Sequence, residues 1–146
     1  LKVLSDPLQQ KGIHVHRYRP SQVNAIYADH DQLKQVVLNI LQNAIKAMPA
    51  NGALHLSIAE ELYEHHKGLR LKVKDTGKGI EPNVLSRIFE PFFTAGKHRG
   101  TGLGLAICRN IVEAHGGEIH AESQQQIGTT ISMWLPCVCQ SQLSTV

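Results

Sequence analysis

The sequence has little of several features that mark specialised classes of protein. Aromatic residues make up 5% of the 146 residues, and there are three cysteines. An odd and sparse cysteine count fits a reducing cytoplasm. The net charge is +3, and no basic run is interleaved with aromatics, so the composition gives no support to nucleic-acid binding. No apolar stretch approaches the ~18 residues that a membrane-spanning helix needs.

The three cysteines do not suggest a metal site. Cys108 lies in a helical apolar pattern and is expected to be a small core residue. Cys137 and Cys139 could be half of a metal site, but no second Cys/His pair follows at a suitable spacing.

The features that are present fit one ordinary globular domain. A chain of this length can bury a sizeable core, and 42% hydrophobic with 18% charged residues is typical of a soluble protein. The chain starts at Leu1, without methionine or a signal-peptide pattern, so we expect a fragment of a longer protein. We predict a single domain over 1–146, with a core over about 13–136 and a polar tail over 137–146.

Hydrophobic periodicity predicts an α/β (α+β) fold of two layers, in which helices cover one face of a mixed, mostly antiparallel sheet. Asp29, with Gln32 three residues later, predicts a capping box at the start of the first long helix. The polar segment 64–68 is expected to join two strands into an antiparallel hairpin. Strands are predicted at 13–18, 25–28, 53–60, 69–75, 118–122 and 129–135, and helices at 29–48, after Pro82 and at 102–115.

A polar stripe runs along the helix predicted at 29–48. Asn39, Asn43 and Lys46 are spaced at i, i+4 and i+7, which places them within an arc of ~60°, roughly opposite the apolar positions. Asn is a mediocre helix former, so two of them in mid-helix call for a reason. The stripe is either a solvated face or a face that binds a ligand.

Two glycine-bearing motifs follow this helix. Asp75 ends a predicted strand and opens the segment Asp75-Thr76-Gly77-Lys78-Gly79-Ile80. A simple turn explains Asp75 and Gly77 but not the second glycine. Further on, Gly100-Thr101-Gly102-Leu103-Gly104-Leu105-Ala106 leads into a helix, whose free N–H groups could bind phosphate oxygens. Its spacing fits neither the dinucleotide motif nor the P-loop.

Phenylalanine is concentrated between these motifs. All three phenylalanines of the chain stand in Phe89-Glu90-Pro91-Phe92-Phe93. They either anchor a loop in the core or hinge a lid over residues 94–101. Lys97 and Arg99 are the only lysine and arginine of that segment.

The order of these boxes resembles the ATP-binding catalytic domain of sensor histidine kinases, in the gyrase, chaperone, histidine-kinase and mismatch-repair ATPase superfamily. The resemblance covers about 13–136 and implies a Bergerat-type fold that binds ATP and Mg²⁺. It implies that Asp75 accepts a hydrogen bond from the adenine amino group, with Gly77 and Gly79 beside the base and Thr129 in support. Asn43 would bind Mg²⁺. The residues implied to bind the phosphates are Lys46, Lys97, Arg99, Gly100, Thr101, Gly102, Leu103 and Gly104.

Asn39 distinguishes between branches of the superfamily. Members that hydrolyse ATP carry Glu at this place as the base for water, whereas an amide cannot take a proton at neutral pH. The sequence is therefore similar to the branch that transfers the γ-phosphoryl group to a protein residue. A regulatory nucleotide-binding module, or a Ser/Thr kinase of the anti-sigma type, is the alternative.

The resemblance also implies partners. None of the nine histidines has the downstream Glu/Asp and Pro that mark the family's phosphoacceptor. We therefore expect that histidine upstream of Leu1, on a dimerisation domain, with a response regulator as the next partner. The parent is expected to be a homodimer and the isolated chain a monomer. The domain is expected to be cytoplasmic, whether or not the parent is anchored in the inner membrane.

Overall fold

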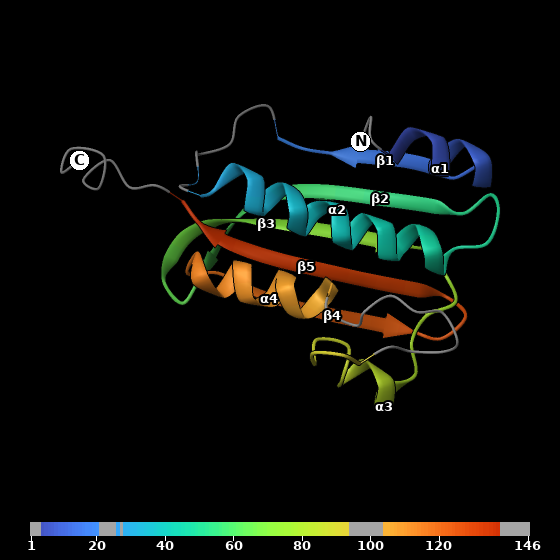
Figure 1. Cartoon of the computed structure of the whole chain (residues 1–146). Helices are drawn as coiled ribbons and strands as arrows, with labels where there is room; N and C mark the ends of the chain where they lie inside the picture. Colours follow the sequence, from blue (N-terminus) through green and yellow to red (C-terminus); the bar gives the residue numbers. More distant parts are fainter. Residues whose placement is uncertain (1–3, 21–25, 27, 94–103, 138–146) are drawn as a thin grey trace.

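The computed structural model describes residues 4–20, 26, 28–93 and 104–137 (Figure 1). Within these parts, none of the helices is long and apolar enough to cross a membrane. The strands are β1 (His14–Tyr18), β2 (Ala53–Tyr63), β3 (His66–Asp75), β4 (Glu118–Gln124) and β5 (Gly128–Pro136). The helices are α1 (Ser5–Lys11), α2 (His30–Ala47), α3 (Pro82–Leu85) and α4 (Gly104–Ala114).

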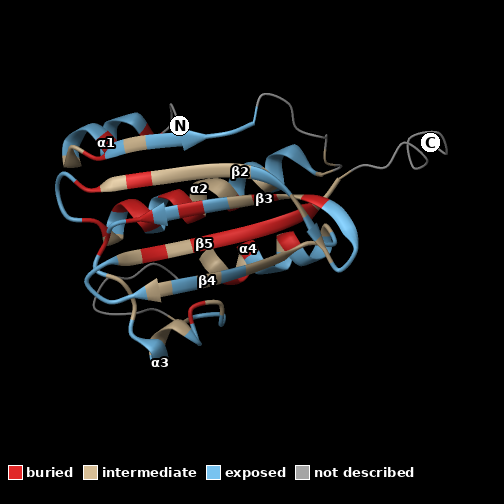
Figure 2. Cartoon of the chain, turned by 180° about the vertical axis from the view of Figure 1, so that it is seen from behind, coloured by how far each residue is buried: buried red, intermediate tan, exposed pale blue. Residues whose placement is uncertain are grey.

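The strands form one mixed sheet in the order β1-β2-β3-β5-β4. β1 runs parallel to β2, and the other neighbouring strands are antiparallel. Helices α2 and α4 lie on one face of this sheet (Figure 1), and the view from behind shows no described helix on the other face (Figure 2). The predicted fold class is therefore confirmed.

The hydrophobic core lies between the sheet and the two long helices. Cys108 of α4 is completely buried, as its apolar spacing predicts, and its thiol contacts the carbonyl oxygen of Val36 on α2 at 3.7 Å. Every second residue of β2 and β3 points into the same layer, because side chains alternate along a strand. The core includes Val36, Ile40, Leu41, Ala44, Ile45, Met48, Leu54, Val73, Cys108, Val112, Ile131, Met133 and Leu135.

Helix α2 begins as its sequence predicts. The Asp29 carboxylate accepts a hydrogen bond from the Gln32 N–H at 3.0 Å, which satisfies one of the free donors of the first turn. The other half of the predicted capping box differs, because the Asp29 N–H donates to Nε2 of His115 at 3.0 Å. This bond joins the start of α2 to the residue that follows α4.

The hairpin is longer than predicted. β2 continues to Tyr63 and β3 begins at His66, so the polar segment 64–68 lies partly within the strand pair. Only Glu64 and His65 form the turn, and both have positive φ angles, 49° and 68°. Such a two-residue turn matches the twist of the paired strands. The polar residues there indicate an exposed ribbon, not a loop.

The first twenty-eight residues contain two further differences. Residues 5–11, for which the sequence pattern predicts no element, form α1, and Leu4 and Leu8 are buried in the core. Two apolar residues in so short a segment give no readable period. The strand predicted at 25–28 is reduced, in the described residues, to one bridge between Ile26 and Cys137, while residues 25 and 27 lie outside them.

Candidate functional site

The polar stripe of α2 lies at the edge of its packed face. Asn43 and Lys46 are exposed, whereas Asn39 is half-buried. The Asn39 side-chain amide donates to the carbonyl oxygen of Gly104, the first residue of α4, at 3.5 Å. Asn39 is therefore not part of a fully solvated face. The contact brings Gly104, in the glycine-rich motif at 100–106, next to α2.

Asp75 stands at the end of β3 and is 5% exposed. Its Oδ1 accepts hydrogen bonds from the backbone N–H groups of Gly77 at 2.8 Å and Thr129 at 3.2 Å. Burial raises the pKa of this carboxyl, and the two N–H donors counteract only part of that effect. Both bonds use the same oxygen.

The second oxygen of Asp75 accepts no hydrogen bond from the described residues. In those residues, no fully buried side-chain nitrogen or oxygen lacks a partner, so Oδ2 reaches accessible space. A carboxylate with one oxygen fixed by the backbone and the other free is suited to accept a bond from a ligand N–H donor.

The loop after Asp75 is clamped from two sides, and each predicted glycine serves one of them. A Cβ on Gly77 would lie 2.6 Å from the carbonyl oxygen of Ala47 at the end of α2, and Lys78 N–H donates to that oxygen at 3.2 Å. Gly79 has a φ of +76°, and a Cβ there would lie 2.3 Å from the carbonyl oxygen of Gln124. The packing of the protein itself thus requires both glycines.

Two hydroxyl residues extend from Asp75 across the sheet, Thr129 on the neighbouring β5 and Ser123 on β4 beyond it. Thr129 of β5 is buried and pairs with Ser123 of β4 in the strand register. The two hydroxyl oxygens are 2.7 Å apart. Ser123 also accepts a hydrogen bond from the N–H of Ile80 at 2.8 Å. Sequence reasoning found Thr129 and missed Ser123.

The signal for Ser123 was present in the sequence. Along β4 the half-buried residues Ile119, Ala121 and Ser123 alternate with exposed ones. The alternation predicts that Ser123 is on the inner face, where a hydroxyl needs a partner.

The phenylalanine segment does not form a core anchor. Phe92 is 75% exposed and has a φ of +64°, and Phe89 and Phe93 are half-buried. The guanidinium carbon of Arg87 lies 4.6 Å from the centre of the Phe93 ring. The predicted lid over 94–101, with Lys97, Arg99, Gly100 and Thr101, lies outside the described residues, as do Gly102 and Leu103.

The described site residues come from distant parts of the sequence and meet at one end of the sheet. The end of α2 contacts the loop after Asp75, that loop contacts the β4–β5 turn, and Asn39 contacts the start of α4. These contacts join α2, the loop after Asp75, the β4–β5 turn and the start of α4 at that end. Fold and site together define a nucleotide-binding domain of the α+β class.

Comparison with known proteins identifies the family. The chain belongs to the histidine kinase-, DNA gyrase B- and HSP90-like ATPases, whose family profile matches residues 28–138. The predicted resemblance is therefore confirmed.

Named relatives of this chain include sensor kinases. It is 40% identical to the sensor histidine kinase ZraS of Escherichia coli (strain K12) over 136 residues, which are 93% of this chain and 28% of ZraS. It is 43% identical to sporulation kinase A of Bacillus subtilis (strain 168) over 111 residues, 76% of this chain and 18% of that kinase. The chain thus spans less than a third of these relatives.

Solved structures agree with this assignment. The catalytic domain of the histidine kinase ThkA superposes with a TM-score of 0.80 at 32% identity, covering 93% of this chain and 86% of that domain. Full-length ShkA in complex with AMPPNP gives a TM-score of 0.80 at 30% identity, covering 94% of this chain and 28% of ShkA.

Proposed function

We propose that this chain is the catalytic domain of a sensor histidine kinase, which binds Mg²⁺-ATP and donates the γ-phosphoryl group to a histidine of a separate dimerisation domain. The observation that carries the proposal is Asp75 Oδ2, which accepts no hydrogen bond from the described residues and lies beside a loop held by backbone hydrogen bonds. In this proposal Oδ2 accepts a hydrogen bond from the 6-amino group of adenine. Gly77 and Gly79 keep the backbone close to the base.

The polar stripe of α2 would meet the phosphates. Lys46 is exposed, and the next residue, Ala47, accepts a hydrogen bond from Lys78 in the loop after Asp75. The Lys46 amine can therefore approach a phosphate of a nucleotide that is bound beside this loop. The described N-terminus of α4 at Gly104 supplies backbone N–H donors. Arg99, Lys97 and the glycines 100 and 102, with Thr101 and Leu103, remain predicted phosphate contacts.

Asn43 is the residue that would hold Mg²⁺. Its side-chain oxygen is a hard ligand, and it is exposed on the same stripe as Lys46. No group of three His, Cys, Asp or Glu side chains in the described residues could hold a metal ion by itself. This fits a magnesium ion that shares its ligands between one amide and the nucleotide. When bound, the ion neutralises phosphate charge.

Asn39 sets the reaction apart from hydrolysis. An amide cannot accept a proton from water, and the side chain of Asn39 already donates to Gly104. In the proposed reaction the bond between the γ-phosphorus and the bridging oxygen breaks and a bond to an imidazole nitrogen forms, with ADP as the leaving group. Catalysis would then come from positioning and charge neutralisation.

The partners and location follow from the proposal. A phosphoacceptor domain of the same kinase supplies the histidine, a response regulator takes the phosphoryl group, and the parent kinase is a homodimer. The domain works in the cytoplasm.

Base recognition provides the test. Guanine presents a carbonyl oxygen where adenine presents its amino group, so two acceptors would face each other at Asp75. We expect ATP to bind about 10- to 100-fold more tightly than GTP. Asp75→Asn should weaken ATP binding and shrink this preference, because an amide can rotate to donate to the guanine oxygen. Calorimetric competition titrations of both nucleotides measure the ratio.

A matched variant controls for the loss of charge. Asp31→Asn removes a carboxylate that is 98% exposed near the start of α2, so it should leave both affinities unchanged. Equal binding of GTP and ATP by the unsubstituted chain would mean that Asp75 is only a turn residue, and the adenine site would be misplaced.

A further inference from the structure

Ser123 contacts two groups near Asp75. Its hydroxyl binds Ile80, at the end of the loop that follows Asp75 (the glycine loop, residues 76–80), and it contacts Thr129, whose N–H donates to Asp75. Ser123 lies on the inner face of β4, paired in register with Thr129 of β5. Thr129 in turn donates its N–H to Asp75 at the end of β3. Ser123, Thr129 and Asp75 therefore form a row across three neighbouring strands. Neither the sequence motifs nor the proposed chemistry gives Ser123 a role.

The Ser123 hydroxyl has three polar neighbours. It accepts a hydrogen bond from Ile80 N–H at 2.8 Å, lies 2.7 Å from the Thr129 hydroxyl, and lies 3.1 Å from the Gly128 carbonyl oxygen. Its single proton can go to Thr129 or to Gly128. If it goes to Gly128, the Thr129 hydroxyl donates to Ser123. Either way, Ser123 fixes the direction of the Thr129 hydroxyl.

The bond to Ile80 holds the far end of the glycine loop. The near end is fixed by Gly77 N–H, which donates to Asp75 Oδ1 at 2.8 Å. Between these ends, Gln126 N–H donates to the Lys78 carbonyl oxygen at 2.7 Å. Through its hydroxyl, the Ser123 side chain ties this loop to β4. Without it, the Ile80 N–H would lose its acceptor in a partly buried place.

The same residue therefore connects to Asp75 by two routes. One runs through Ile80 and the loop to Gly77, and the other runs through Thr129. One route ends at the backbone N–H of Gly77 and the other at the backbone N–H of Thr129, and both groups donate to Asp75 Oδ1. A carboxylate distinguishes an amino group from a carbonyl only if its free oxygen is held in place.

We propose that Ser123 is a positioning residue for base selectivity: its hydroxyl fixes the glycine loop and Thr129 so that Asp75 presents one oxygen to adenine. This inference rests on the proposed function. It assigns a role in selectivity to a side chain that does not itself contact the base.

Two variants of Ser123 test the inference. Ser123→Ala removes the hydroxyl and should weaken ATP binding about 5- to 30-fold, because the loop and Asp75 Oδ2 are then no longer held in place for the base. GTP binding, which does not use Asp75 as acceptor, should change less, so the ATP/GTP ratio should shrink. Ser123→Thr keeps the hydroxyl and suits a strand, so it should restore the ratio to within about 2-fold of the parent.

A second measurement does not depend on nucleotide. Hydrogen exchange at the Ile80 amide in the nucleotide-free chain should be faster in Ser123→Ala and near the parental rate in Ser123→Thr. If the alanine variant does not fold, Ser123→Cys fills the same space with a much poorer acceptor and should change exchange and selectivity in the same direction.

Ser132→Ala is the matched control. Ser132 is a buried serine of β5, the strand next to β4, but its hydroxyl contacts His120, 3.0 Å away, on the face of the sheet without described helices. It should leave the ATP/GTP ratio and Ile80 exchange unchanged. An equal ratio in Ser123→Ala and the parent, with unchanged Ile80 exchange, would overturn the role of Ser123 while leaving ATP binding intact. A parent that binds neither nucleotide would overturn both proposals.

Discussion

At the scale of single residues, Asp75 is a buried carboxyl whose charged form lowers the stability of the fold. Burial raises its pKa, and the N–H groups of Gly77 and Thr129 lower it only in part. Since the folded-state pKa lies above the unfolded-state value, the native chain binds more protons than the unfolded chain between the two values. The free energy of unfolding therefore falls as the pH rises through that interval, and the loss persists above it.

This gives a prediction for Asp75→Asn. Oδ1 of the amide can still accept from Gly77 and Thr129, but the variant has no charge to bury. We expect the variant to be at least as stable as the parent at pH 7, and its advantage to shrink as the pH falls through the raised pKa of Asp75 towards the ordinary carboxyl value of about 4. Urea unfolding of both chains between about pH 4 and pH 8 measures the difference. A variant that loses stability relative to the parent as the pH rises would contradict the assigned direction.

Single residues also show which parts of the site a sequence can predict. Cys108 and Asp75 were predictable, because an apolar period and the end of a strand place them without tertiary information. Burial raises the pKa of the Cys108 thiol to about 11, so this thiol stays protonated at neutral pH. The packing that requires glycine at position 79 was not predictable. A Cβ there is excluded by the carbonyl of Gln124, which is forty-five positions away in the sequence.

At the scale of elements, helix α2 was predicted well, the shorter β1, β4 and α3 were predicted close to where they lie, and α1 was not predicted. Helix α2 has eighteen residues and several apolar turns, so its period and its cap agree. Helix α1 is seven residues long, and tertiary contacts help to hold it. Lys11 donates to the carbonyl oxygens of Ile45 and Met48 at the end of α2, at 2.8 and 3.0 Å. No local pattern indicates that contact.

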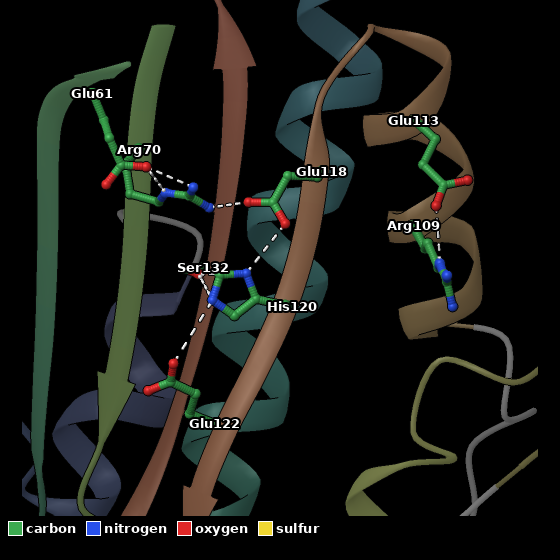
Figure 3. Close-up of polar contacts among 8 residues, drawn as sticks. All are labelled: Glu61, Arg70, Arg109, Glu113, Glu118, His120, Glu122 and Ser132. Atoms are coloured by element: carbon green, nitrogen blue, oxygen red, sulfur yellow. Dashed lines mark hydrogen bonds and ion pairs between the residues drawn. The ribbon is translucent and has the colours of Figure 1, made fainter. Parts of the chain in front are cut away.

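The face of the sheet without described helices contains an ion-pair network that links several strands (Figure 3). Arg70 of β3 contacts Glu61 of β2 at 2.6 Å and also pairs with Glu118 of β4. Its side chain is 8% exposed. Burial alone would lower the pKa of Arg70, but the bonds to Glu118 and Glu61 outweigh it and raise the pKa. The charged form is therefore the stable one.

Removing this guanidinium should destabilise the sheet. Arg70→Met leaves two partly exposed carboxylates close to each other without their shared cation, and we expect a loss of about 1–3 kcal/mol in the free energy of unfolding. The matched control is Arg109→Met on α4, whose pair with Glu113 is 54% exposed on both sides (Figure 3). It should cost less than about 0.5 kcal/mol. Urea unfolding would contradict the ranking if the two losses were equal.

At the scale of the whole molecule, the two faces of the sheet differ in what they carry. The helix-covered face contributes Asp75, Thr129 and Ser123 to the site, and the other face carries the Arg70 network. The sequence predicted the layers, because the periodic segments are local, and it proposed Asp75 and Thr129 for the site but missed Ser123. It could not predict how the loop after Asp75 is clamped between α2 and β4, because those contacts depend on the packing of elements far apart in the sequence.

The proposed division of labour between domains leads to the last prediction. Because Asn39 offers no base for water and the chain has no phosphoacceptor motif, the isolated chain incubated with γ-labelled ATP should neither retain label nor release phosphate above a trace rate. Adding the phosphoacceptor domain of the parent kinase should produce an acid-labile, base-stable label on that domain, as expected for phosphohistidine. Asn43→Ala should reduce this transfer at least about 10-fold in the presence of Mg²⁺, because a ligand of the ion is lost. Gln42→Ala, at the neighbouring exposed position of α2, should leave the transfer unchanged. Phosphate release by the isolated chain at the rate of a dedicated ATPase would contradict the proposal, since the amide at position 39 could not then be what separates this domain from hydrolysing relatives.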